Sequence, residues 1–454
     1  MGVIADKRLS LLRGLVRALP QTSLRSLELA LGLTKDEALV EVRDLISVEL
    51  EFRYVKEAVF APYLPLFRSR TDGLEGVVFP DWIIDNLWSA LEKRETELYM
   101  QSRYAMRGLR AEDPTPVIFF RLVTAAVGIC RETPDEVLPA KATPADRDNL
   151  EEFINYLDLH RIARHALHKV PEFMGRIDAE RAAAMRLMFK DACAIENEGG
   201  YRLMEILFAN LDDGPQIIKF VATVSDRANE RFLASSELAI FGERILAAIE
   251  LQLKDLKAFM GTRGKVCEDL GVAGQKVAQC LALIHSFENY IDLVRDGPWG
   301  KRVADGHKLI AELVESQLKG AERALEDTLP LKSERVYGRV RKETPHFERP
   351  PKPESVVRAR QTLAFVRQVR NTAQSGGFAS LHAKTAQALE SALDSYFEEL
   401  LSIANGEEAF DATVVMQFFE MVTDLMDALC GEEKAVVARR RVASSDLNKP
   451  KKVA

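Results

Sequence analysis

Three histidines lie close together in the sequence, and imidazole rings at helical spacing could bind a metal ion or transfer protons. His160, His165 and His168 fall within nine residues, and on one helix their directions would spread over roughly 140° of arc. Arginine and lysine residues are interleaved with them, and this positive charge disfavours binding of a cation. We therefore interpret the segment as a basic helix face. A metal-dependent helical enzyme is kept only as the third functional hypothesis.

A second pair that could do acid–base chemistry is His285 and Glu288, three residues apart. Such a pair can act as a hydrogen-bonded acid/base couple. Pairs with this spacing are far commoner as contacts on a helix surface, and we favour that interpretation.

The glycines in Gly261–Lys265 invite comparison with a phosphate-binding loop. The first glycine of the required spacing is absent, and Val266 stands where that motif needs Ser or Thr. We interpret the segment as a turn between helices.

No local signature of a nucleophile is present, because the sequence lacks a Gly-x-Ser-x-Gly elbow. The cysteines have no zinc-binding spacing and are interpreted as free thiols of a reducing compartment. They are Cys130, Cys193, Cys267, Cys280 and Cys430. The sequence therefore favours a protein that is not an enzyme and has no cofactor.

Two clusters of arginines are candidates for contact with a partner. The first lies on one expected helix, and the second lies near the C-terminal end of the sequence. The candidates are Arg358, Arg360, Arg367, Arg370, Arg439, Arg440 and Arg441. Exposed charge on a helix is more often a solvated face, so partner binding by these residues is a hypothesis. An acidic protein is the favoured partner over RNA or an anionic membrane surface.

Composition limits the remaining classes of protein. The 454 residues are 47% hydrophobic and 29% charged, as in globular proteins, with a formal net charge of −7. An acidic chain repels a phosphate backbone, so nucleic-acid binding is disfavoured. The most apolar run, residues 117–130, is too short to cross a bilayer and contains Arg121. The N-terminus lacks the continuous apolar core of a signal peptide, and we expect a cytoplasmic protein.

The elements that would position these residues are helices. In residues 1–62, two short helical patterns are followed by Gly32 and by a capping box formed by Thr34 and Glu37, which opens a third helix. This arrangement resembles a helix-turn-helix. Residues 48–54 then alternate between apolar and polar, as in a strand of a winged helix. The same residues also continue a helical face, and the two alternatives remain open at this stage.

The rest of the chain divides by composition into four regions. We predict a main helical body at 80–330, a proline-rich basic linker at 331–354, a C-terminal helical module at 355–431 and a disordered basic tail at 432–454. The predicted fold class is all-α: an irregular multi-helix bundle with a separate C-terminal module and, as one alternative, a winged-helix-like N-terminal domain.

Long amphipathic helices without a catalytic motif favour a cytoplasmic helical scaffold or adaptor. Its expected partners are other proteins or a second copy of the chain, rather than nucleic acid or a membrane. The alternative is a DNA-binding transcriptional regulator that uses residues 1–62. The expected recognition helix is acidic, with Asp36, Glu37, Glu41 and Asp44, and this charge disfavours DNA.

Overall fold

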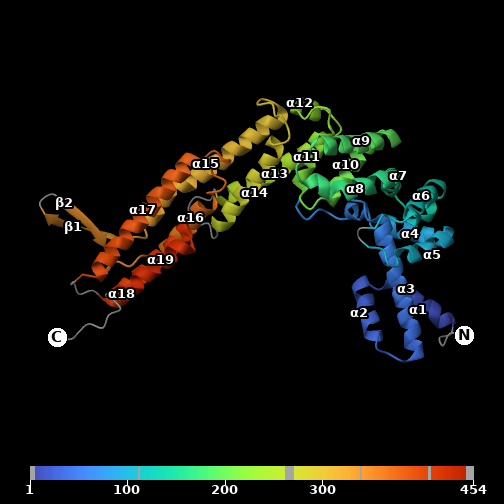
Figure 1. Cartoon of the computed structure of the whole chain (residues 1–454), viewed down its shortest axis with the longest axis horizontal. Helices are drawn as coiled ribbons and strands as arrows, with labels where there is room; N and C mark the ends of the chain where they lie inside the picture. The colour runs from blue at the N-terminus through green and yellow to red at the C-terminus, as the bar shows by residue number, and fades with distance from the viewer. Residues whose placement is uncertain (1–5, 111–112, 261–269, 338–339, 407–410, 446–454) are drawn as a thin grey trace. The chain divides into compact units, whose positions relative to one another are not determined.

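The computed structural model describes residues 6–110, 113–260, 270–337, 340–406 and 411–445. The chain folds into two compact units, Met1–Arg227 and Ala228–Ala454. The described residues form nineteen α-helices and one two-stranded sheet (Figure 1). The predicted all-α class is confirmed. The predicted body at 80–330 is divided between the two units, and the predicted boundaries at 330 and 354 both fall inside the second.

The first unit begins with three helices that share a small core. They are α1 (Asp6–Ala18), α2 (Gln21–Leu31) and α3 (Glu37–Phe60). The centre of this group consists of four buried side chains, Val16, Leu24, Ile46 and Leu50. The helical spacing of these residues brings one apolar face of each helix to the same place.

Helix α3 settles the alternative that the sequence left open. Residues 48–60 are helical throughout, so the winged-helix alternative lacks its hairpin. Phe52 stacks on Tyr99 with the ring centroids 4.3 Å apart. This contact stabilises the helical conformation of residues 48–54 over the strand that their alternating pattern also allowed. The N-cap is Asp36, whose carboxylate accepts a hydrogen bond from the backbone N–H of Ala38 at 2.9 Å. The predicted capping box of Thr34 and Glu37 is wrong, because Asp36 takes the N-cap position.

The C-terminal end of α3 is also held by a side chain. The guanidinium of Arg164 donates to the backbone carbonyls of Ala58 and Val59. These carbonyls belong to the last turn of α3, where no intrahelical donor is available. Arg164 therefore ties α3 to the helix that carries it.

The remainder of the first unit is a packed set of shorter helices. Thr143 and Asp146 form a reciprocal capping box at the start of one of them, which satisfies backbone N–H groups of its first turn. The elements are η1 (Leu64–Phe67), α4 (Trp82–Arg94), α5 (Thr96–Met106), α6 (Val117–Glu132), η2 (Pro134–Glu136), α7 (Pro144–Asp158), α8 (His160–Met174), α9 (Ala179–Ile195), α10 (Gly199–Asn210), η3 (Gly214–Gln216) and α11 (Ile217–Val224).

The second unit contains longer helices and the hairpin. Helix α15 packs on α17, and α18 packs on α16, α17 and α19. The elements are α12 (Glu230–Leu233), α13 (Ala239–Met260), α14 (Leu270–Glu288), α15 (Pro298–Glu326), β1 (Leu331–Tyr337), β2 (Val340–Pro345), α16 (Pro353–Gln368), α17 (Ala379–Ala404), α18 (Ala412–Cys430) and α19 (Glu432–Ala443).

Two predictions for this unit need correction. The segment 331–354 is not simply a linker, because β1 and β2 pair as an antiparallel hairpin with Leu331 opposite Pro345. The tail is not disordered at 432–443, where α19 buries Ala435, Ala438 and Val442. Small residues three and four apart allow α19 to pack closely, and that signal does not depend on the large apolar residues whose absence predicted disorder. The predicted disorder at 446–454 lies outside the described residues.

A buried carboxylate fixes the start of α15. Glu230 is 1% exposed and accepts hydrogen bonds from the backbone N–H groups of Val294 at 2.7 Å and Trp299 at 2.6 Å. It also accepts one from Gly300 at 3.3 Å. The first N–H groups of a helix have no intrahelical partner and favour negative charge. Glu230 thus anchors the helix whose far end forms part of the groove described below.

No helix in the described part of the chain is long and apolar enough to span a membrane.

Candidate partner-binding groove

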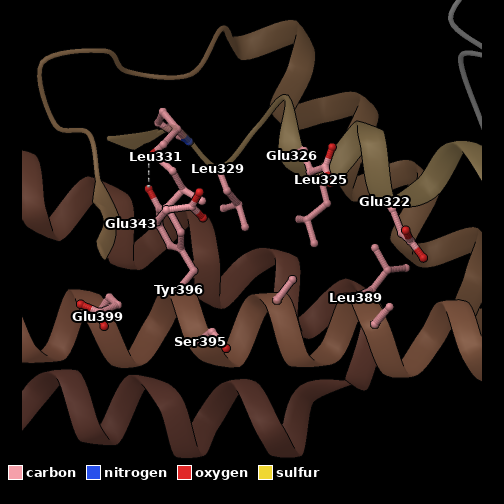
Figure 2. Close-up of a pocket in the computed structure, with 13 residues that line it drawn as sticks. Glu322, Leu325, Glu326, Leu329, Leu331, Glu343, Leu389, Ser395, Tyr396 and Glu399 are labelled. Atoms are coloured by element: carbon pink, nitrogen blue, oxygen red, sulfur yellow. Dashed lines mark hydrogen bonds between the residues drawn. The ribbon is translucent and has the colours of Figure 1, made fainter. Parts of the chain in front are cut away.

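A groove in the second unit is the candidate site. It has a volume of about 520 Å³ and lies between the end of α15, the hairpin and α17 (Figure 2). The lining residues are Glu322, Leu325, Glu326, Leu329, Pro330, Leu331, Glu343, Ala388, Leu389, Ala392, Ser395, Tyr396 and Glu399. A volume of several hundred Å³ is typical of sites that bind a ligand or anchor a side chain.

The groove exists because one face of α17 carries small side chains. Ala388, Ala392 and Ser395 are four and three residues apart, so they line one helix face. All three are exposed. Short side chains on this face leave space beside α15 that larger ones would fill.

The floor of the groove is apolar. Leu325, Leu329 and Leu389 are buried, as is Tyr396, and Figure 2 shows their side chains converging from the two sides of the groove. The Tyr396 hydroxyl donates to the carbonyl of Pro330 at 3.3 Å. Burial raises the pKa of this tyrosine, so it stays neutral and acts as a structural link across the groove.

The rim is acidic. Glu322 and Glu326 lie one turn apart on α15 and are both exposed, and Glu343 is an exposed residue of β2. No ion pair is formed by these three glutamates within the described residues. Glu399 lines the other end of the groove and already interacts with another residue. Like charges four residues apart destabilise a helix by a few tenths of a kcal/mol, so a cation beside Glu322 and Glu326 would relieve that repulsion.

None of the described lining residues is basic. An apolar floor under a carboxylate rim suits a segment that has an apolar anchor and flanking lysine or arginine residues. This is the pattern of an amphipathic basic helix in a groove.

The first arginine cluster divides into two kinds of residue. Arg358, Arg360, Arg367 and Arg370 are all exposed. Arg367 donates to the backbone carbonyl of Asp427 at 3.2 Å and so helps to terminate α18. The other three have no ion-pair partner among the described residues. None of the four lines the groove, and their role in partner binding stays a prediction.

Most arginines of the second cluster already form ion pairs within the second unit. Arg441 forms a bidentate ion pair with Glu398 of α17 at 2.5 and 2.9 Å. Arg439 pairs with Asp424 of α18 at 3.1 Å. Arg440 is exposed and makes no ion pair with a described residue. Two of these three predicted contact residues therefore hold α19 on its neighbours, and partner binding by the cluster remains untested.

The three histidines of α8 do not gather into a site. Nδ1 of His160 donates a hydrogen bond to the backbone carbonyl of Leu157, 3.0 Å away, while His165 and His168 are exposed. Burial lowers the pKa of His160. Within the described ranges, no group of three or more His, Cys, Asp or Glu side chains is arranged to hold a metal ion.

The predicted pair of His285 and Glu288 is formed, with Nδ1 and Oε2 3.2 Å apart. The structure adds His307 of α15, whose Nε2 lies 2.9 Å from the other oxygen of Glu288. This contact joins α14 to α15. The predicted turn at Gly261–Lys265 lies outside the described residues.

Buried charges elsewhere have structural partners. Arg202 forms a bidentate pair with Glu152, both distances being 2.8 Å. The ammonium of Lys219 donates to the backbone carbonyls of Phe173 at 2.9 Å and Met174 at 3.1 Å, at the end of α8. Arg202 is thus held in an ion pair, and Lys219 satisfies carbonyls at the end of α8.

No protein-family model, no curated protein and no solved structure matches this chain.

The groove was not predicted from the sequence. Two sequence patterns belong to it: the like charges of Glu322 and Glu326 one turn apart, and the row of small residues Ala388, Ala392 and Ser395. Both patterns are common on solvated helices. Only the tertiary contact between α15 and α17 makes them one site.

Proposed function

We propose that this protein is a cytoplasmic, non-enzymatic scaffold or adaptor, and that its groove docks a basic, amphipathic segment of a partner chain. The observation that supports this proposal is the exposed pair of carboxylates, Glu322 and Glu326, above an apolar floor. Leucine-sized anchors fit such a floor, and cationic side chains on the same segment would meet the rim.

The negative charge of the rim determines which segments the groove should bind. An anionic rim attracts cationic segments and repels acidic ones, since like charges placed together at an interface are costly. Exposed carboxylates also act mainly on the association rate, and that contribution weakens as salt rises. Binding to the groove should therefore be selective for positive charge and sensitive to ionic strength.

The test uses two fluorescent peptides that share a leucine face and differ only in carrying lysine or glutamate on the polar face. Anisotropy titration of the full chain should show binding of the basic peptide only. The double variant E322K/E326K should weaken that binding by roughly tenfold or more.

The matched control is D305K/E312K, which makes the same change of net charge at exposed positions of α15 that do not line the groove. It should bind the basic peptide nearly as the wild type does. Equal loss of affinity in both variants would show that the peptide follows overall charge, and the groove proposal would then fail.

A further inference from the structure

The first helix of the chain has an apolar surface that nothing in the described first unit covers. Leu11 and Leu15 of α1 are 70% and 63% exposed, although Val16, one residue further, is buried. Leu11 and Leu15 are four residues apart and thus form one stripe on the outer face of the helix. Isolated exposed leucines are ordinary, but a stripe on a helix is typical of an interaction surface.

The same group of helices exposes further leucines. In addition to the stripe on α1, four others are at least two-fifths exposed: Leu27, Leu29, Leu33 and Leu39. Figure 1 shows α1, α2 and α3 as neighbours at the N-terminal end of the first unit. Only four buried side chains form the centre of this group. Part of the apolar surface of α1, α2 and α3 is therefore not buried in their shared core.

The charge of α1 is opposite to that of the groove. Helix α1 carries four basic residues and one acidic residue. Arg8 is exposed and lies three residues before Leu11, so it flanks the leucine stripe. The groove has a glutamate rim and an apolar floor. The stripe and its arginine therefore have the composition of the segment that the groove is proposed to bind.

The spacing of the two leucines also matches that of the two rim glutamates. Leu11 and Leu15 are separated by one helical turn, as are Glu322 and Glu326 along the rim. A helix laid along the groove could place its two leucines toward Leu329 and Leu389 while Arg8 approaches the rim. The two surfaces lie on different units, so the contact between copies is heterologous: one surface of one copy meets another surface of the next.

We propose that Leu11 and Leu15 of α1 dock in the groove of a second copy of this chain, so that copies associate head to tail. This inference rests on the proposed function and names its partner. Heterologous contacts of this kind build closed rings or open chains rather than only dimers. The average mass in solution should therefore rise steadily with protein concentration.

The test is analytical ultracentrifugation of the full chain and of two variants, each lacking one surface. L11D/L15D removes the leucine stripe and keeps the groove, whereas E322K/E326K alters the groove and keeps the stripe. The substituted residues are all exposed, and circular dichroism checks that both variants are folded. Each variant alone should remain monomeric, and an equimolar mixture should form a one-to-one dimer that grows no further.

A wild type that stays monomeric at about 200 µM overturns the proposal. So does a mixture that remains monomeric, or an E322K/E326K variant that still self-associates, because the contact would then not use the groove. The peptide titration separates this failure from failure of the proposed function. If the groove binds the basic peptide while the wild type stays monomeric, only the self-association is wrong.

Discussion

Helices α1 to α3 and helices α17 to α19 differ in how far their side chains are buried or paired within their own units. Four buried side chains form the centre of the N-terminal group, whereas α18 alone buries eight. Three of the four basic residues of α19 form ion pairs: Lys434 and Arg441 with carboxylates of α17, and Arg439 with Asp424 of α18. The leucines of α1 meet nothing comparable in the described first unit. The charged side chains of α19 are paired within their own unit, whereas Leu11 and Leu15 of α1 are left exposed.

This difference suggests where the stability of each region resides. A helix packed on three neighbours depends on internal contacts, while a group with a small core gains much of its stability from whatever covers it. The following predictions test that contrast, beginning with the largest expected effect.

Glu230→Ala should destabilise the second unit most. The substitution leaves three backbone N–H groups buried without their carboxylate acceptor, and we expect the free energy of unfolding to fall by about 3 kcal/mol. Urea denaturation monitored by hydrogen exchange in α13 to α15 measures the change. Glu312→Ala, at an exposed position of α15, should alter stability by less than about 0.5 kcal/mol. A similar effect of both substitutions would contradict the role assigned to Glu230.

Leu24→Ala should weaken the N-terminal group by about 2 kcal/mol, because Leu24 is fully buried in its small core. Hydrogen exchange should speed up in α1, α2 and the first half of α3, and α6 to α8 should keep their protection. Leu29→Ala removes the same atoms from a side chain that is 78% exposed and should have little effect. Loss of protection across the whole first unit would mean that the N-terminal group is not the separate, weaker region described above.

E322Q/E326Q should increase the stability of the second unit slightly. Removing two like charges one turn apart on α15 should raise the free energy of unfolding by roughly 0.2–0.5 kcal/mol. The same variant should bind the basic peptide more weakly than the wild type. Parallel thermal unfolding and anisotropy titration measure both effects. A decrease in both quantities would indicate that the glutamates support the fold instead of a partner.

His160 should make the first unit sensitive to mild acid. Burial lowers the pKa of its ring, so the folded state stays neutral at pH values where the unfolded chain takes up a proton. Stability should therefore fall as the pH drops below the ordinary histidine value of about 6.5. In His160→Asn, the decrease in melting temperature between pH 7.5 and 5.5 should be smaller. His165→Asn, at an exposed position, serves as the control and should behave as the wild type.

Local signals in the sequence were sufficient for most helices. Periodic apolar residues predicted helices that the structure contains, and cap-forming residues such as Thr143 and Asp178 stand at the start of two of them. Gly431 ends α18 with φ of +96°, a backbone conformation that favours glycine. These features depend on residues a few positions apart, which is why one sequence reveals them.

Features that depend on distant residues were missed. The groove requires α15 and α17 to lie side by side, and Arg439 and Arg441 are held by carboxylates 15 and 43 residues away. Without knowledge of these distant carboxylates, the sequence around the two arginines predicts a solvent-exposed basic tail. Residues 48–54 satisfied both a strand and a helix pattern, and the stacking of Phe52 on Tyr99 is a tertiary contact that no local pattern contains.

Helix α3 has a mechanical consequence. Its 24 residues make a rod about 36 Å long, and no proline or glycine interrupts it to act as a hinge. One end carries the small leucine-rich group, and the other is clamped by Arg164 and packed through Phe52. Helix α3 therefore joins the N-terminal group to the aromatic residues of α4 and α5 through a segment without a hinge, and the ion pair of Arg17 with Glu92 adds a direct link from α1 to α4.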